Sequence, residues 1–124
     1  MNCTLARLHA ALRAHAEGLY ACQAAAELLI AHDTWLRRDD FTGRFTRISA
    51  TITSGTEVAE LDWAGAVTAL NAGELPCSGS EEQMLRLTAS LADGIPVSLR
   101  RALPGLDERN ISLVIKAVLR TSGQ

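Results

Sequence analysis

The feature that most constrains the fold is a proline-free, alanine-rich segment that runs from residue 4 to about residue 38. Its apolar and small residues recur at alternating steps of three and four, which is the spacing of one face of an α-helix. Alanine favours helix, and Gly18 is the weak point of the pattern. The segment is therefore predicted to be helical. Its apolar seam consists of Leu5, Leu8, Leu12, Leu19, Cys22, Ala26 and Leu29.

A single helix of this length does not fit inside a chain of 124 residues. At about 1.5 Å per residue the helix would be about 52 Å long, whereas a domain of this size is about 35 Å across. The helix must break near Gly18 or near Asp33 and Thr34, or it must project and pack against a second chain. Because the seam continues through Gly18 without a change of phase, we expect the projecting helix.

Residues 44–61 follow a different pattern, in which side chains alternate with a period of two. Ile48, Ala50 and Ile52 point to one side, polar residues point to the other, and β-branched residues are frequent. A turn at Gly55 joins the two strands of a predicted β-hairpin. A lone hairpin is only marginally stable in water, so we expect it to lie on helices or to pair with a strand of another chain.

Residues 62–124 predict a cluster of short helices. Asp62 is placed to cap the first of them, and Ser80 with Gln83 has the form of a capping box for the second. Gly94 is a stop signal for that helix, and Asp107 is placed to cap the last one. The last helix carries one apolar stripe, formed by Ile111, Val114, Ile115, Val118 and Leu119.

The predicted fold is therefore α+β and mostly helical. It has a long N-terminal helix or helical hairpin over residues 1–40, one β-hairpin over 44–61, and a C-terminal cluster of short helices over 62–124. Because the chain shows no internal repeat and has the size of one domain, we expect residues 1–124 to form a single domain.

The composition of the chain indicates which partners and which cellular compartment to expect. The formal net charge is −2, from 12 basic and 14 acidic residues, which argues against a protein that neutralises many phosphates. The longest run without a charged residue has 11 residues, 63–73, and is too short for a membrane span. The first residues show no pattern of a secretion signal. Three cysteines without a C-x-x-C pair fit a reducing cytoplasm, so we expect a cytoplasmic protein without a membrane partner.

Catalytic and metal-binding patterns are weak in this sequence. His9 and His15 are six residues apart and face different sides of a helix, whereas metal ligands on one helix are three or four residues apart. His15 and Cys22 share a side, but only a second helix could complete a site there. Serines and histidines occur without the local signature of a nucleophilic triad. We expect no cofactor and no catalytic residue.

A ligand site is one alternative. Cys77, Ser78 and Ser80 precede a predicted helix, whose free N–H groups could hold a small anion and whose dipole could lower the pKa of the thiol. The arginine of cysteine phosphatases is absent, because Gln83 stands in its place, and the pattern of a phosphate-binding loop is also missing. A capped helix start with a half-buried cysteine explains the same residues.

Nucleic-acid binding is a second alternative. Residues 77–124 carry a small positive charge, and their order of helix, Gly94 turn and short helix loosely follows a helix-turn-helix. Arg100 and Arg101 are the candidate contacts. The short helix has barely two turns before Pro104, however, and scattered arginines in contact with solvent explain the same charge.

Three segments carry a resemblance to known proteins. They are residues 73–81 (Gly-Glu-Leu-Pro-Cys-Ser-Gly-Ser-Glu), 89–97 (Ala-Ser-Leu-Ala-Asp-Gly-Ile-Pro-Val) and 105–110 (Gly-Leu-Asp-Glu-Arg-Asn). Together they resemble a family of small, uncharacterised actinobacterial proteins, over residues 62–123 more distinctly than over the N-terminal helix. The 11 arginines and 20 alanines agree with such a source. Because the family has no established activity, the resemblance implies no site residue.

The leading hypothesis is a non-catalytic cytoplasmic protein that self-associates as a two-fold homodimer, through the helical seam or the hairpin. Burial of apolar surface would hold the two chains together. The same seam could instead form the core of one chain. The candidate interface residues are Leu5, Leu8, Leu12, His15, Leu19 and Leu29.

Overall fold

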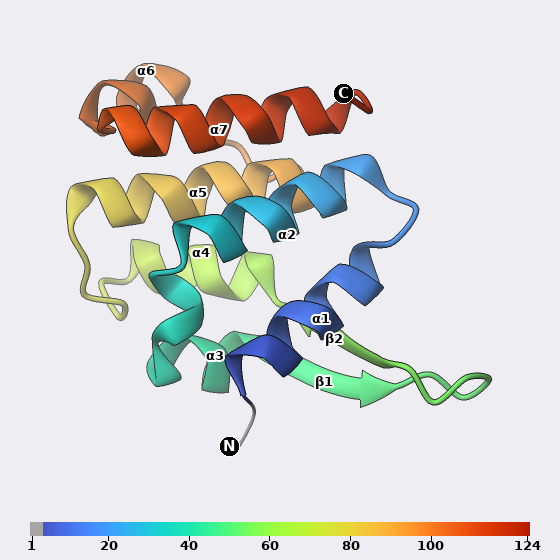
Figure 1. Cartoon of the computed structure of the whole chain (residues 1–124). Helices are drawn as coiled ribbons and strands as arrows, with labels where there is room; N and C mark the ends of the chain where they lie inside the picture. Colours follow the sequence, from blue (N-terminus) through green and yellow to red (C-terminus); the bar gives the residue numbers. More distant parts are fainter. Residues whose placement is uncertain (1–3) are drawn as a thin grey trace.

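The computed structural model describes residues 4–124, which form seven α-helices, two short 3-10 helices and one antiparallel hairpin (Figure 1). The α+β, mostly helical class is therefore confirmed. In chain order the elements are α1 (Leu5–Ala16), α2 (Tyr20–His32), η1 (Trp35–Arg37), α3 (Asp39–Phe45), β1 (Thr46–Ala50), β2 (Glu57–Leu61), α4 (Trp63–Asn71), α5 (Gly79–Asp93), α6 (Leu99–Ala102), η2 (Leu103–Gly105) and α7 (Glu108–Thr121).

The N-terminal segment is two helices rather than one. α1 ends at Ala16, and α2 begins at Tyr20 after a tight turn in which the N–H of Leu19 donates to the carbonyl of Ala16 at 3.1 Å. Gly18 makes this turn possible, because its φ of +88° lies in the left-handed region that other residues avoid. The expectation of a continuous, projecting helix is therefore wrong. An unchanged seam phase did not predict continuity, because both helices bury most of the seam within one chain.

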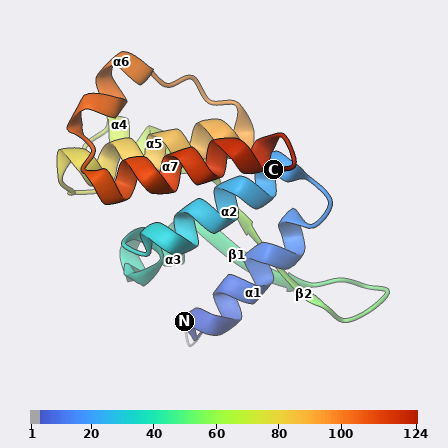
Figure 2. The same cartoon turned by 45° about the horizontal axis from the view of Figure 1, so that its top comes forward.

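α2 occupies the centre of the molecule (Figures 1 and 2). On one side it packs against α5 and α7, and one core cluster, which includes Leu28 and Met84, fills that space. On the other side it approaches α1, which in turn lies on β2. The second core cluster lies there, with Leu12, Leu29 and Ala59 among its members. The two clusters place nearly all large apolar side chains of α2 inside the protein.

A second expectation is wrong at α3. The sequence predicts that the helical segment ends at about residue 38, yet residues Asp39–Phe45 form a short helix. Phe41 and Phe45, four residues apart, share one face and point into the core, where the ring of Phe41 also lies 5.3 Å from that of Trp35. Burial of these aromatic rings outweighs the weak local propensity for helix.

The hairpin is confirmed, although its ladder is shorter than the sequence pattern. β1 and β2 pair in register from Thr46 opposite Leu61 to Ala50 opposite Glu57. The tip beyond the ladder projects away from the body of the protein (Figure 1). Ile52 lies in this tip and is fully exposed, so the predicted inward face does not extend to it.

Most of the helix ends predicted for the C-terminal half lie where the structure has them. The predicted cap at Asp62 is confirmed, since its carboxylate accepts from the N–H of Gly65 at 2.9 Å, and α5 stops at the left-handed Gly94 as predicted. The predicted capping box is wrong by two residues. It is formed by Ser78 and Glu81, because α5 begins at Gly79.

Candidate functional site

α7 begins where the sequence predicts. The side chain of Asp107 accepts a hydrogen bond from the N–H of Asn110 at 2.8 Å, which satisfies one of the free donors at the helix start. The helix then runs to Thr121 along the outer side of α2 and α5 (Figure 2). α7 is therefore an outer layer of the protein, with one side on the core and the other toward solvent.

The inward side of α7 carries mostly small or polar residues. Ala117 is completely buried, and Asn110 and Val114 are nearly so. Val114 and Ala117 join the core cluster that includes Leu28 of α2 and Met84 of α5. Small side chains here let the helix approach the core closely. Three of the six large aliphatic residues of α7 are nevertheless exposed, whereas Val114 and Leu113 pack on the core.

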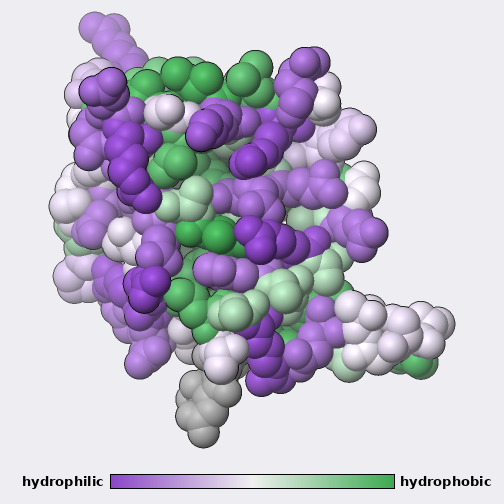
Figure 3. Space-filling model, viewed as in Figure 1, coloured by the Kyte–Doolittle hydropathy of each residue, from purple (hydrophilic) through white to green (hydrophobic). Residues whose placement is uncertain are grey.

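The outward side of α7 is apolar. Ile115, Val118 and Leu119 are 54, 53 and 51% exposed, and their spacing of three and four places them on one face of the helix. We call these three residues the α7 outer face. Figure 3 shows hydrophobic surface along the upper edge of the molecule, where α6 and α7 lie. An apolar cluster of this kind on a well-formed helix is typical of a contact surface for another protein.

Charged residues lie at both ends of α7. Glu108 lies in the first turn and Arg120 in the last, with Lys116 one turn earlier. This order suits the dipole of the helix itself, since acidic groups are favoured at its start and basic groups at its end. Arg109 also lies in the first turn, where its guanidinium donates to the carbonyl of Ala31 at 2.9 Å, so this end of α7 carries both signs of charge.

The residues of the predicted seam interface lie elsewhere. Leu8, Leu12 and Leu29 are at most 6% exposed and belong to the core. The first turn of α1 is partly buried against the same cluster, at Leu5. These side chains leave no surface for a second chain, so this part of the seam is core, and its assignment as an interface is wrong. His15 and Leu19 are exposed, on opposite sides of the turn that joins α1 and α2.

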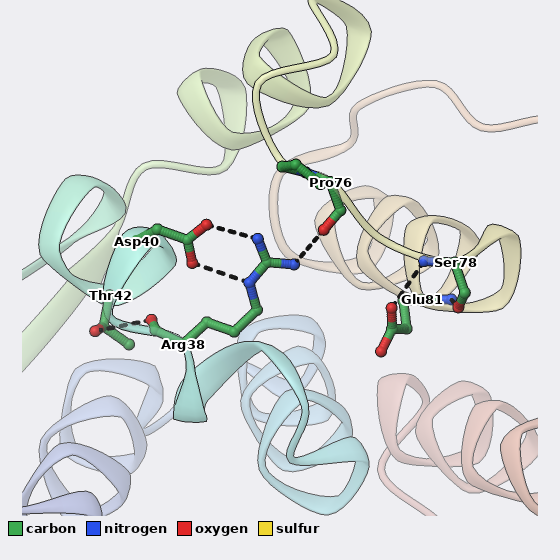
Figure 4. Close-up of polar contacts among 6 residues, drawn as sticks. All are labelled: Arg38, Asp40, Thr42, Pro76, Ser78 and Glu81. Carbon is green, nitrogen blue, oxygen red and sulfur yellow. Dashed lines mark hydrogen bonds and ion pairs between the residues drawn. The ribbon is translucent and has the colours of Figure 1, made fainter.

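The loop before α5 is held by polar contacts within the chain (Figure 4). Ser78 Oγ accepts from the N–H of Glu81 at 3.1 Å, and the Glu81 carboxylate accepts from the N–H of Ser78 at 2.8 Å. Arg38 donates to the carbonyl of Pro76 at 2.7 Å and pairs with Asp40 at 2.6 Å. A carboxylate thus already lies at the start of α5, where the anion was expected.

The thiol in this loop is not activated. Partial burial raises the pKa of Cys77, and the carboxylates of Glu82 and Glu81 raise it further, against a smaller opposing effect of Arg38. The expected direction was the opposite one, because the sequence shows neither the partial burial of this thiol nor the position of the two carboxylates. Ser80 is not the cap either, since its Oγ accepts from Asn110 Nδ2 at 3.1 Å. These contacts describe a structural helix start rather than a ligand loop.

Arg100 and Arg101 lie on α6, which has four residues. Both are exposed, and the ion pairs found among residues 4–124 do not include either of them. A helix of one turn is shorter than the recognition helix of a helix-turn-helix, which reads bases along the major groove. Nucleic-acid binding through these two residues stays a prediction, without a reading helix to support it.

His15 and Cys22 lie on two different helices, close to the turn that joins α1 and α2. Both line a cleft of about 310 Å³, together with Asp62 and Asp93. Across the part of the chain that the structure describes, no three histidine, cysteine or acidic side chains converge in a way that would hold a metal ion. In the same region, no helix is both long enough and apolar enough to cross a lipid bilayer.

The comparisons with known proteins give no match, whether to a family model, to a curated protein or to a solved structure. The resemblance to actinobacterial proteins therefore stays a prediction.

The α7 outer face was visible in the sequence as part of a stripe, but its exposure was not. Ile115, Val118 and Leu119 follow the spacing of a helix face that could lie on the core or on the surface. Ala117 and Asn110 mark a second, less apolar side of the same helix. This second side is the buried one, which is why the more apolar side is exposed.

Proposed function

We propose that this protein acts without catalysis, by self-association through the α7 outer face. The observation that carries the proposal is the orientation of α7, which buries Ala117 and leaves Ile115, Val118 and Leu119 about half exposed. With the small Ala117 inside and the large aliphatic side chains outside, a single chain buries less apolar surface than the reverse orientation would bury. The same orientation stabilises a complex, because a second surface then covers the exposed aliphatic groups.

The strength of such a contact can be bounded. Full burial of one aliphatic side chain contributes about 1.5–3 kcal/mol. Six half-exposed side chains, three from each chain, therefore contribute about 4.5–9 kcal/mol against an association cost of about 4–15 kcal/mol. The two ranges overlap, so the dimer forms and dissociates with protein concentration rather than being permanent.

The proposal includes a cytoplasmic location, which the cysteines support. Cys22 and Cys77 are both unpaired thiols and both are half-buried. Reduced, partly buried cysteines behave as small apolar residues in a reducing compartment. The expected actinobacterial source is part of the same proposal.

Sedimentation velocity of matched variants tests the proposal. Val118→Glu places a charge in the middle of the α7 outer face and is expected to give monomers at concentrations where the wild type is dimeric. Ile52→Glu is the control, because Ile52 is more exposed than any residue of that face but lies at the hairpin tip. Circular dichroism confirms that both variants are folded. Equal dissociation of both variants, or of neither, would refute the proposal.

A further inference from the structure

We propose that a cleft at the C-terminal end of α7 binds a small organic carboxylate with a planar ring and a single negative charge. The cleft has a volume of about 440 Å³. Sites for small molecules typically have volumes of about 300–1,000 Å³. Residues of α1, α2 and the end of α7 line the cleft, whereas Ile115, Val118 and Leu119 do not, so the proposal does not rest on self-association.

Part of the cleft is aromatic and apolar. Tyr20 begins α2, and its side chain is 60% exposed. The end of α7 lies beside the start of α2 (Figure 2), and a Cβ added to Gly123 would lie 3.1 Å from Cε2 of Tyr20. Ala16 and Ala26 also line the cleft and are almost completely buried. The exposed ring and the two buried methyl groups together offer an apolar surface for the ring of a ligand.

The charged side chains that line the cleft leave one positive charge unmatched. Arg13 donates two hydrogen bonds to the Glu27 carboxylate, from Nε at 2.7 Å and from Nη2 at 3.1 Å. Arg120 also lines the cleft but takes part in none of the ion pairs found among residues 4–124. The cleft therefore holds two guanidinium groups and one carboxylate.

The charges of the cleft are close enough to affect one another. The hydrogen bonds from Arg13 lower the pKa of Glu27, burial opposes this effect, and the Arg120 guanidinium lowers the pKa further. Glu27 is therefore ionised at neutral pH and is already bonded to Arg13. The guanidinium of Arg120 is left for a second anionic group.

A carboxylate with a planar ring fits both parts of the cleft. Its charged group can accept from Arg120, and a hydrogen bond between charged groups is stronger than one between neutral groups. Its ring can lie on Tyr20 and the buried alanines. One unmatched positive charge suits a monoanion better than a phosphate ester, which carries about 1.5–2 negative charges at neutral pH.

A titration of the whole chain with phenylacetate, followed by NMR through the backbone amide signals, tests the proposal. Saturable shifts are expected at Tyr20, Gln23 and Gly123, which line the cleft from two sides. Phenylacetamide lacks the charge of this probe, and acetate lacks its ring. Each is expected to bind about tenfold more weakly, because each loses one of the two contacts.

Two arginine variants show whether the cleft is the site. Arg120→Gln is expected to weaken the binding of phenylacetate about tenfold and to bring it close to the binding of phenylacetamide. Arg101→Gln is the matched control, because Arg101 is exposed and outside the ion pairs of residues 4–124 as well but lies on α6. Its dissociation constant for phenylacetate should stay close to the wild-type value.

Two results would overturn the proposal directly. Phenylacetate could cause no saturable shift at Tyr20, Gln23 and Gly123, or it could bind no better than phenylacetamide. Equal weakening in both arginine variants would also overturn the proposal, because the acid would then follow the overall positive charge rather than this cleft. Each of these results leaves the proposed self-association standing, since sedimentation measures that separately.

Discussion

Ala117 and Val118 are neighbours in the chain, yet Ala117 is completely buried beneath α7 while Val118 is 53% exposed on its outer surface. The helix is rotated so that its smaller residue lies inside. Asn110, nearly buried on the same inner side, hydrogen-bonds Ser80 Oγ of α5 at 3.1 Å and helps to fix this rotation. The apolar surface left outside is the basis for the proposed self-association.

This relationship predicts that two adjacent substitutions change the stability of the fold by very different amounts. Ala117→Leu adds volume to a closed part of the core and should destabilise the fold by about 1–3 kcal/mol. Val118→Gln should change the free energy of unfolding by no more than about 0.5 kcal/mol under dilute, monomeric conditions. Urea denaturation at low protein concentration measures both. Similar losses for the two variants would show that α7 is rotated differently.

The turn between α1 and α2 depends on Gly18. Gly18→Ala should destabilise the fold by about 1–2 kcal/mol, because alanine is strained at a φ of +88° even though no atom lies near its added Cβ. Gly43 is the matched control. It lies in α3, its added Cβ also meets no atom, and its φ is not positive, so Gly43→Ala should stabilise by about 0.5–1 kcal/mol.

Thermal unfolding of the two glycine variants distinguishes the folded-back segment from a continuous helix. In a continuous helix alanine would be favourable at both positions. A rise in melting temperature for Gly18→Ala would therefore contradict the turn.

Much of the fold could be predicted because its signals are local. The caps at Asp62 and Asp107, the stop at Gly94 and the hairpin follow from residues within a few positions of each other. The break at Gly18 was one of two open alternatives, since periodicity within a helix does not show what covers it. α3 was missed because the polar residues around Phe41 concealed its aromatic face.

The candidate site was less predictable for the same physical reason. A helical apolar stripe shows that something covers that face, but it does not show whether the cover is the chain itself or another molecule. Leu8 and Leu12 lie on a stripe that the chain covers, whereas Ile115 and Val118 lie on one that it does not. Only the packing of distant segments separates the two.

The start of α5 gives a third prediction. Ser78→Ala removes the side chain that caps the N–H of Glu81 and should cost about 1 kcal/mol of stability. Gln83→Ala is the control for the capping position predicted from the sequence, and it should change the stability by only a few tenths of a kcal/mol. Chemical denaturation compares them. A larger loss for Gln83→Ala would place the cap at Ser80 instead.

His32 gives a prediction about pH. Burial lowers the pKa of His32 below its ordinary value of 6.5, and the Arg109 guanidinium lowers it further. The carboxylates of Glu81, Asp107 and Asp33 act in the opposite direction without reversing the shift. Because the unfolded chain then binds the proton more tightly, the neutral imidazole stabilises the fold fully above about pH 6.5, and this stability is lost as the pH falls through the folded-state pKa.

Denaturation midpoints between pH 7.5 and pH 5 measure this effect. The wild type should lose stability over that interval, and His32→Gln should lose less of it. His15→Gln is the control for a histidine-to-glutamine change at an exposed position. An unchanged slope in His32→Gln would show that this imidazole does not contribute.

The central claim is self-association, and the absolute mass in solution tests it most directly. Light scattering after size exclusion, over a range of protein concentrations, should show a rise from the chain mass of 13.3 kDa toward twice that value. The same measurement on Val118→Glu should stay at the mass of one chain. A wild-type mass of 13.3 kDa at every concentration would contradict the account.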